Sequence, residues 1–242
     1  MRSRLLHAFL AIAWLAAAPA MAHAAYRELT FPLEGGKVMP YALSVPDGSP
    51  QTPRPLVLAL HPGGERMPRY GSMFARGVVL PALRRLDAIV VAPDCPTERW
   101  AEEGADTAVM QLLDQVMREH AVDRTRILVI GFSMGGGGAW YFAARHPDFF
   151  AGAIPMAATA GNQPLDALAR MPTYIIHSRA DSVVPFAPAE RNARELERLG
   201  KPVHFEALDG LPHFNMGGYV PALERAVAWV VARWNSQARQ AG

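Results

Sequence analysis

Apolar residues along the chain follow two kinds of pattern. Short continuous apolar runs, typical of strands buried on both faces of a sheet, occur at 56–60, 88–92, 127–130, 151–155, 173–176 and 203–207. Two further strand-like runs, 27–31 and 39–45, are joined by a segment with two glycines that is typical of a hairpin turn. Apolar residues at helical spacing predict helices over 106–120, 134–145, 188–199 and 221–234.

The regular alternation of these strands and helices predicts the fold class. Strands that are separated by helices pair in parallel through crossover connections, which place helices on both faces of the sheet. No internal repeat, low-complexity tract or long linker divides the sequence. Only 16 residues separate Met156 from Thr173, so we expect no large lid. The sequence therefore predicts one α/β domain over residues 25–242 with a mostly parallel central sheet.

The first 24 residues have a different pattern. Arg2 and Arg4 precede an apolar run of 14 residues, Leu5–Ala18, and small residues follow at 22 and 24. This order of basic, apolar and small residues is typical of a secretory signal peptide, and a run of this length is short for a membrane span. We expect cleavage after Ala24, or alternatively after Ala22, and export to the periplasm or the medium. An uncleaved N-terminal anchor is the alternative.

Composition and charge exclude several classes of protein. The 242 residues are half apolar and 19% charged, which is typical of a globular domain. Without the leader, the chain has 22 basic and 22 acidic residues, so its charge gives no reason to expect a nucleic acid or an anionic membrane as a partner. Its one cysteine, Cys95, excludes an internal disulfide and a multi-cysteine zinc site, and we expect no metal.

A candidate nucleophile lies between a predicted strand and a predicted helix. The segment Gly131–Gly135 reads Gly-Phe-Ser-Met-Gly. In such a turn the serine occupies a strained backbone position, its hydroxyl projects above the sheet edge, and the glycines leave room for the turn. The helix N-terminus places free N–H groups near a developing negative charge. We therefore expect Ser133 to be a catalytic nucleophile.

A serine hydroxyl needs a base that accepts its proton. His213 lies in the loop between the last predicted strand and the last predicted helix, from which it can reach over the sheet edge. In this architecture the acid falls between the serine and the histidine in chain order. Asp181 directly follows a predicted strand, whereas Asp166 precedes that strand and Asp209 is only four residues from His213. We therefore expect a Ser133, His213 and Asp181 triad.

Acyl transfer also needs two N–H donors for the oxyanion. The N–H of Met134, which follows the nucleophile, is the first candidate. The second is expected in the loop that begins His-Pro-Gly-Gly at His61. Proline has no N–H, so Gly63 is the preferred donor and Gly64 is the next. We expect His61 to order this loop through hydrogen bonds without transferring protons.

Together these motifs resemble those of the α/β-hydrolase superfamily over nearly all of the chain after the leader. More narrowly, the chain resembles small secreted esterases of the phospholipase/carboxylesterase, feruloyl-esterase-like and polyhydroxybutyrate-depolymerase-like groups, and bacterial proteins labelled predicted peptidases. The pattern of the last group is matched at His61–Arg66, Pro93–Pro96 with Trp100, Ser133–Gly136 and Asp181–Pro185. Pro62 departs from that pattern, in which glycine is found. The resemblance implies a Ser-His-Asp mechanism with an acyl-enzyme and no cofactor.

Three aromatic residues, Trp100, Phe214 and Tyr219, are candidates for contact with the substrate. The leading hypothesis is an exported serine esterase that acts on a small or polymeric ester. A serine peptidase of the prolyl-oligopeptidase-like type on the same fold and a non-catalytic binding module remain alternatives. The sequence does not identify the ester or the oligomeric state.

Overall fold

The structure is a computed structural model, and it describes residues 25–168 and 170–241. The expected signal peptide, residues 1–24, lies outside the described residues. Within the part of the chain that is described, no helix is long and apolar enough to cross a lipid bilayer. The same residues contain no group of three or more His, Cys, Asp or Glu side chains that could hold a metal ion.

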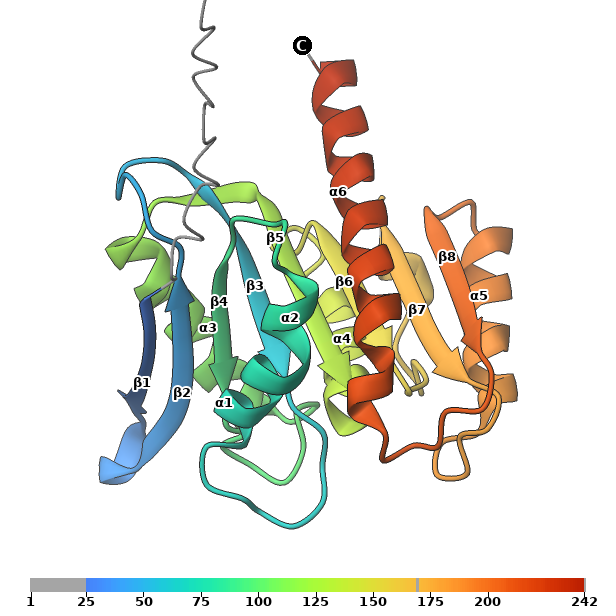
Figure 1. Ribbon diagram of the computed structural model, residues 1–242, viewed down its shortest axis with the longest axis horizontal. Coiled ribbons are helices and arrows are strands. Elements are labelled where there is room, and N and C mark those ends of the chain that lie inside the picture. The colour runs from blue at the N-terminus through green and yellow to red at the C-terminus, as the bar shows by residue number, and fades with distance from the viewer. Residues whose placement is uncertain (1–24, 169, 242) are drawn as a thin grey trace, which may run out of the picture.

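Eight strands form one sheet in the order β1-β2-β4-β3-β5-β6-β7-β8. The strands are Ala25–Pro32 (β1), Val38–Val45 (β2), Arg54–Leu60 (β3), Ile89–Pro93 (β4), Val122–Phe132 (β5), Gly152–Met156 (β6), Thr173–Ser178 (β7) and Val203–Leu208 (β8). β2 is antiparallel to both β1 and β4, and every other neighbouring pair is parallel. The carboxyl ends of β3 to β8 therefore meet at one edge of the sheet (Figure 1). The predicted α/β fold class is confirmed.

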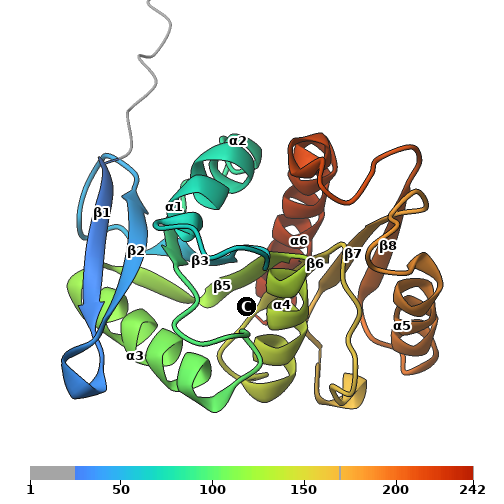
Figure 2. The ribbon, with the colours of Figure 1, turned by 90° about the horizontal axis from the view of Figure 1, so that it is seen from below.

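Helices cover both faces of the sheet. They are Tyr70–Phe74 (α1), Leu80–Ala82 (α2), Glu103–Glu119 (α3), Met134–Arg145 (α4), Phe186–Arg198 (α5) and Val220–Ala241 (α6). Figure 2 shows α1, α2 and α6 on one face and α3, α4 and α5 on the other. The crossovers that join parallel strands produce these two layers.

The core consists of two main layers separated by the sheet. β3 is buried along its whole length, and its side chains alternate between the two faces. Leu56, Leu58 and Leu60 pack in the layer with α3 and α4, whereas Val57 and Ala59 pack in the layer with α1, α2 and α6. The continuous apolar run in the sequence reflects burial on both faces.

One helical segment is not visible in the apolar pattern. α1 and α2 are joined by a π-helical turn, so the chain is helical from residue 70 to 82. Gly71, Gly77 and Pro81 interrupt the periodicity from which a helix would be predicted. A Cβ atom at Gly71 would lie 2.4 Å from the Ala92 carbonyl oxygen, so glycine lets α1 lie against the end of β4.

Glycines also let α4 approach the strand ends closely. A Cβ atom at Gly135 would lie 1.9 Å from the Leu60 carbonyl oxygen, and one at Gly136 would lie 2.4 Å from the Met156 carbonyl oxygen. Real side chains do not approach so closely, so neither position accepts a larger residue without movement of the backbone. Gly137, by contrast, has open space where a Cβ would be.

This contrast predicts opposite effects of the same substitution within one helix. Gly137→Ala should raise the free energy of unfolding by up to about 1 kcal/mol, because alanine favours a helix. Gly135→Ala should lower it by about 1–3 kcal/mol, the usual cost of forcing atoms into a packed region. Urea unfolding of both variants beside the wild type measures the difference. Equal shifts in both variants would contradict the close approach of α4 to β3.

Candidate active site

The turn between β5 and α4 holds Ser133 in a strained conformation. Its φ is 53° and its ψ is −116°, a region that residues other than glycine rarely adopt. Such backbone strain costs on the order of 1–3 kcal/mol. A Cβ atom at Gly131 would lie 1.9 Å from the Gly135 carbonyl oxygen, so the turn closes only with glycine at that position. The strained turn places the serine at the carboxyl edge of the sheet.

Three side chains from different strand ends form a continuous hydrogen-bonded chain. The Ser133 hydroxyl lies 2.8 Å from Nε2 of His213, and Nδ1 of His213 lies 2.7 Å from Oδ2 of Asp181. The carboxylate can only accept, so Nδ1 carries the proton and Nε2 accepts from the serine hydroxyl. His213 and Asp181 are buried and Ser133 is partly exposed. The structure thus brings together the three residues expected from the sequence.

Backbone N–H groups hold the carboxylate of Asp181. Its Oδ1 accepts hydrogen bonds from the N–H of Val183 at 2.9 Å and from that of Val184 at 2.8 Å. Burial acts to raise the pKa of Asp181, but the bond from His213 and these two N–H bonds outweigh burial and lower the pKa below its ordinary value. The carboxylate is therefore charged and fixed in orientation.

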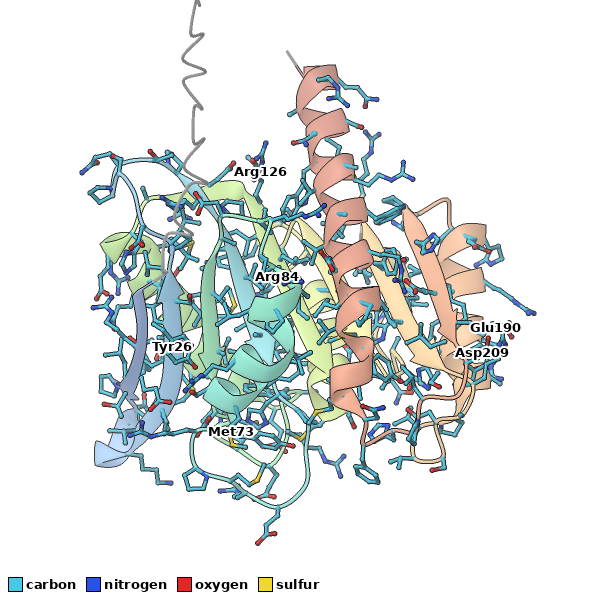
Figure 3. The ribbon with its side chains drawn as sticks, in the orientation of Figure 1. Tyr26, Met73, Arg84, Arg126, Glu190 and Asp209 are labelled. Atoms are coloured by element: carbon cyan, nitrogen blue, oxygen red, sulfur yellow. The ribbon has the colours of Figure 1, made fainter. Side chains whose placement is uncertain are left out.

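The other candidate acids lie away from the base. Asp209 forms an ion pair with Arg179 at 3.4 Å, and Figure 3 shows Asp209 at the end of the sheet where the edge strand β8 lies. Asp166 lies in a short 3₁₀ turn that precedes β7, and its backbone carbonyl accepts a bond from Lys201. Neither carboxylate has a hydrogen bond to His213 among the described residues.

A second buried histidine supports the loop that carries Asp181, a role that no pattern in the sequence indicates. His177, in β7, is fully buried, and its Nε2 donates a 2.9 Å hydrogen bond to the carbonyl of Val184. The same nitrogen lies 3.8 Å from Oδ2 of Asp181, beyond hydrogen-bond range. Nδ1 has no hydrogen-bond partner within the described residues. His177 thus ties β7 to the loop whose N–H groups hold Asp181.

The two expected oxyanion donors lie against each other. A Cβ atom at Gly63 would lie 3.2 Å from Cβ of Met134, so the loop after β3 contacts the first residue of α4. Within the described residues, neither N–H group donates to a protein acceptor. Met134 occupies the first turn of its helix, where N–H groups have no partner inside the helix. Both groups are therefore available to an incoming oxygen.

His61 fixes the loop that carries Gly63. Nδ1 of His61 donates to the Pro62 carbonyl at 2.6 Å, and Nε2 accepts the Cys95 N–H at 2.9 Å. The indole N–H of Trp100 donates to the His61 carbonyl at 2.9 Å. The expectation that Trp100 contacts substrate is corrected here, because its side chain is fully buried beneath the loop.

The remaining aromatic candidates differ in exposure. Phe214 is 84% exposed and its ring meets that of His213 edge-on, so it is placed to contact a bound molecule. Tyr219 is fully buried and packs edge-on against Phe132, which in turn lies beside His213. The expectation that Tyr219 contacts substrate is therefore wrong for this structure. Its ring instead packs against Phe132, which contacts the imidazole of His213.

A groove of about 390 Å³ opens beside the oxyanion donors. The β1–β2 turn, the loop after β3 and the loop after β4 form its walls, and Gly63 and Met134 are both among its lining residues. Ser133 and His213 are not among its lining residues. The groove therefore reaches the residues that carry the two expected oxyanion donors, but not the nucleophile or the base.

An eight-stranded, mostly parallel sheet with a Ser-His-Asp chain at its carboxyl edge defines an α/β-hydrolase. Residues 89–214, which include Ser133, Asp181 and His213, match the model of the "PETase: PET hydrolase-like" family. This match covers more than half of the chain, and the chain belongs to the PET hydrolase-like family.

Individual relatives agree with this family. The chain is 32% identical over 178 residues to "Putative esterase NocK" of Nocardia uniformis subsp. tsuyamanensis, a match that covers 69% of this chain and 52% of that protein. It is 33% identical over 93 residues to Cutinase 2 of Thermobifida cellulosilytica, covering 38% of this chain and 35% of the relative. A crystal structure of a thermostable esterase aligns with a TM-score of 0.75 and 28% identity over 86% of this chain and 62% of that one. The chain thus spans about half the length of NocK.

Among the described residues, the ring of His177 has one hydrogen bond, from Nε2 to the Val184 carbonyl. We therefore expect its glutamine and asparagine variants to differ in the reactivity of Ser133. His177→Gln can place an amide N–H where Nε2 lies and keep the bond to Val184, whereas the shorter amide in His177→Asn reaches only the Nδ1 position. We expect labelling of Ser133 by a fluorophosphonate to stay within about threefold of the wild type in the glutamine variant. In the asparagine variant it should fall roughly tenfold, the scale of one lost buried hydrogen bond.

A measurement of stability separates this role from a general packing role. The asparagine variant should have the lower urea midpoint, because it leaves the buried Val184 carbonyl without this bond, but both variants should be fully folded without urea, so their labelling rates compare folded proteins. Equal labelling rates for the two variants would mean that His177 does not position the loop that carries Asp181 through Nε2.

Proposed function

We propose that this protein is an exported serine hydrolase that cleaves carboxylic esters through an acyl-enzyme. The observation that carries the proposal is the hydrogen-bonded chain from Ser133 through His213 to Asp181, next to two N–H groups that have no protein acceptor in the described part of the chain. The esterase and cutinase relatives support an ester as the substrate. Small esters and polyesters both fit this class of substrate.

Each residue has one role in the first half of the reaction. Nε2 of His213 accepts the hydroxyl proton as Ser133 Oγ attacks the carbonyl carbon of the ester. The carbonyl oxygen becomes an anion, which the N–H groups of Met134 and Gly63 stabilise. Asp181 holds the imidazole in the required tautomer and stabilises its positive charge. The tetrahedral intermediate then collapses, and His213 gives its proton to the departing alcohol oxygen.

The second half repeats the same steps with water. Nε2 of His213 takes a proton from a water molecule, whose oxygen attacks the acyl carbon bound to Ser133. The same two N–H groups stabilise the second oxyanion. Collapse releases the carboxylic acid, and the proton returns to Ser133 Oγ. No redox step or external group takes part, and the atoms balance as ester plus water to acid plus alcohol.

Two alternatives differ in chemistry. A peptidase on this fold would have to protonate an amine, a poorer leaving group than an alcohol. A non-catalytic binding module would have no need for a nucleophile in a strained conformation that costs free energy of folding. The strain at Ser133 therefore favours a catalyst over a binding module.

Ser133→Ala should abolish fluorophosphonate labelling and lower kcat/KM for p-nitrophenyl esters by about a thousandfold or more, because it removes the hydroxyl oxygen that forms the acyl-enzyme. A panel of p-nitrophenyl esters beside peptide anilides separates esterase from peptidase. Labelling that persists in the variant would place the nucleophile elsewhere. Turnover of an anilide without turnover of any ester would favour the peptidase.

The leader gives the export proposal its own test. Expression of the full chain in a bacterial host should yield a periplasmic or extracellular product whose first residue is Ala25, measured by mass spectrometry of the intact protein. Ala22→Arg together with Ala24→Arg should block cleavage, because the cleavage site requires small residues. A product that retains Met1 in the wild type would contradict the proposed signal peptide.

A further inference from the structure

The groove and the catalytic base lie on opposite sides of the nucleophile. The walls of the groove belong to β1, β2, β4 and β3 or to the loops that follow them. Asp181 and His213 follow β7 and β8, and β5, which carries Ser133, lies between the two sets in the sheet. Figure 1 shows the corresponding loops at separate ends of the same sheet edge. A bound ester therefore has two distinct directions in which to extend.

The chemistry of the reaction assigns each direction to one part of the ester. His213 Nε2 must lie within hydrogen-bond reach of the alcohol oxygen, because it gives that oxygen a proton. The carbonyl oxygen must point to the N–H groups of Met134 and Gly63. The alcohol part then lies on the side of His213 and Phe214, and the acyl part continues away from the base. Gly63 and Met134 line the groove, so the groove lies next to the oxyanion donors on the side toward which the acyl part would extend.

The lining of the groove indicates what kind of acyl group it accepts. Val38 is 57% exposed and Met67 is 40% exposed, and both line the groove. Arg66 and Glu98 form an ion pair at 2.6 Å between two walls of the groove, so their charges offset each other. The other charged lining residues are of both signs, namely Lys37, Glu65 and Asp94, and the Asp94 carboxylate is held by two backbone N–H groups. A volume of about 390 Å³ lies within the range of small-molecule sites. These features fit an extended, uncharged acyl group.

We propose that the groove between the β1–β2 turn and the loops after β3 and β4 is the acyl subsite, and that the alcohol part leaves past the exposed ring of Phe214. The assignment rests on the proposed esterase function and names the part of the substrate that each side of Ser133 holds. It makes Met67 and Val38 determinants of acyl length, and Phe214 a determinant of alcohol size.

Two methionines provide a matched pair for the test. Met67 lines the groove, whereas Met73 on α1, labelled in Figure 3, lies outside the groove lining and is 54% exposed. Met67→Glu should lower kcat/KM for p-nitrophenyl octanoate roughly tenfold, the effect of losing contacts with about two methylene groups. The loss for p-nitrophenyl acetate should be smaller, because its acyl group is short, so the ratio of octanoate to acetate kcat/KM should fall. Met73→Glu should leave both esters unchanged.

Phe214→Ala supplies the opposite selectivity. With the acyl group fixed as acetate, it should lower kcat/KM for a naphthyl ester relative to the ethyl ester by roughly fivefold, because a large aromatic contact is lost. The ratio of octanoate to acetate should not change. The same assays therefore separate effects on the acyl part from effects on the alcohol part.

The outcomes are distinguishable. If Met67→Glu changes alcohol selectivity but not acyl selectivity, or changes acetate and octanoate equally, the acyl assignment is overturned while the esterase proposal stands. If the wild type is neither labelled by a fluorophosphonate nor hydrolyses any ester, the proposed function fails, and the subsite assignment fails with it. A urea unfolding midpoint of Met67→Glu close to that of the wild type shows that the variant is folded.

Discussion

The close approach of α4 to the ends of β3 and β5 is the constraint on which the site depends. Gly131 and Gly135 lie so near other backbone atoms that a Cβ at either position would overlap a carbonyl group. Only this contact allows the chain to turn sharply enough to hold Ser133 at a positive φ. The free energy of packing in the sheet and helix thus offsets local strain, and the result is a serine that points out of the protein at the sheet edge.

Two histidines that do not transfer protons hold the rest of the site in place. His61 joins the loop after β3 to the loop after β4, and His177 joins β7 to the loop that carries Asp181. Each uses an imidazole ring as a rigid connector between backbone groups. The triad residues and Gly63 lie in loops and turns, so their positions depend on such buried connections. The site is therefore a set of loops whose geometry depends on a few buried hydrogen bonds.

Much of this could be predicted from the sequence, and the failures have physical causes. The strand pattern predicted all eight strands, because buried parallel strands consist of continuous apolar runs. Ser133, Asp181 and His213 could be selected because their positions after strands place them at one edge. The orientation of side chains could not be predicted from such positions. Trp100 and Tyr219 follow strands on loops near the site, yet both rings turn inward and are buried. His177 directly follows a predicted strand, and nothing in that position indicates a role in the site. Its role comes from a hydrogen bond to the Val184 carbonyl, which only the three-dimensional structure shows.

Protonation of His61 at low pH would affect the loop that carries Gly63, because this ring accepts one of the hydrogen bonds that hold the loop. Burial lowers the pKa of His61 below its ordinary value of 6.5, outweighing the Pro62 carbonyl and Asp94, which act to raise it. In the unfolded chain the ring gains a proton at its ordinary pKa. The stability that the neutral ring contributes to the folded state is therefore complete above that pH. It is lost as the pH falls from the ordinary pKa through the lower pKa of the folded state. A protonated Nε2 cannot accept the Cys95 N–H. At low pH the loop that carries Gly63 would therefore lose its hydrogen bond to the Cys95 N–H, even where the β-sheet stays folded.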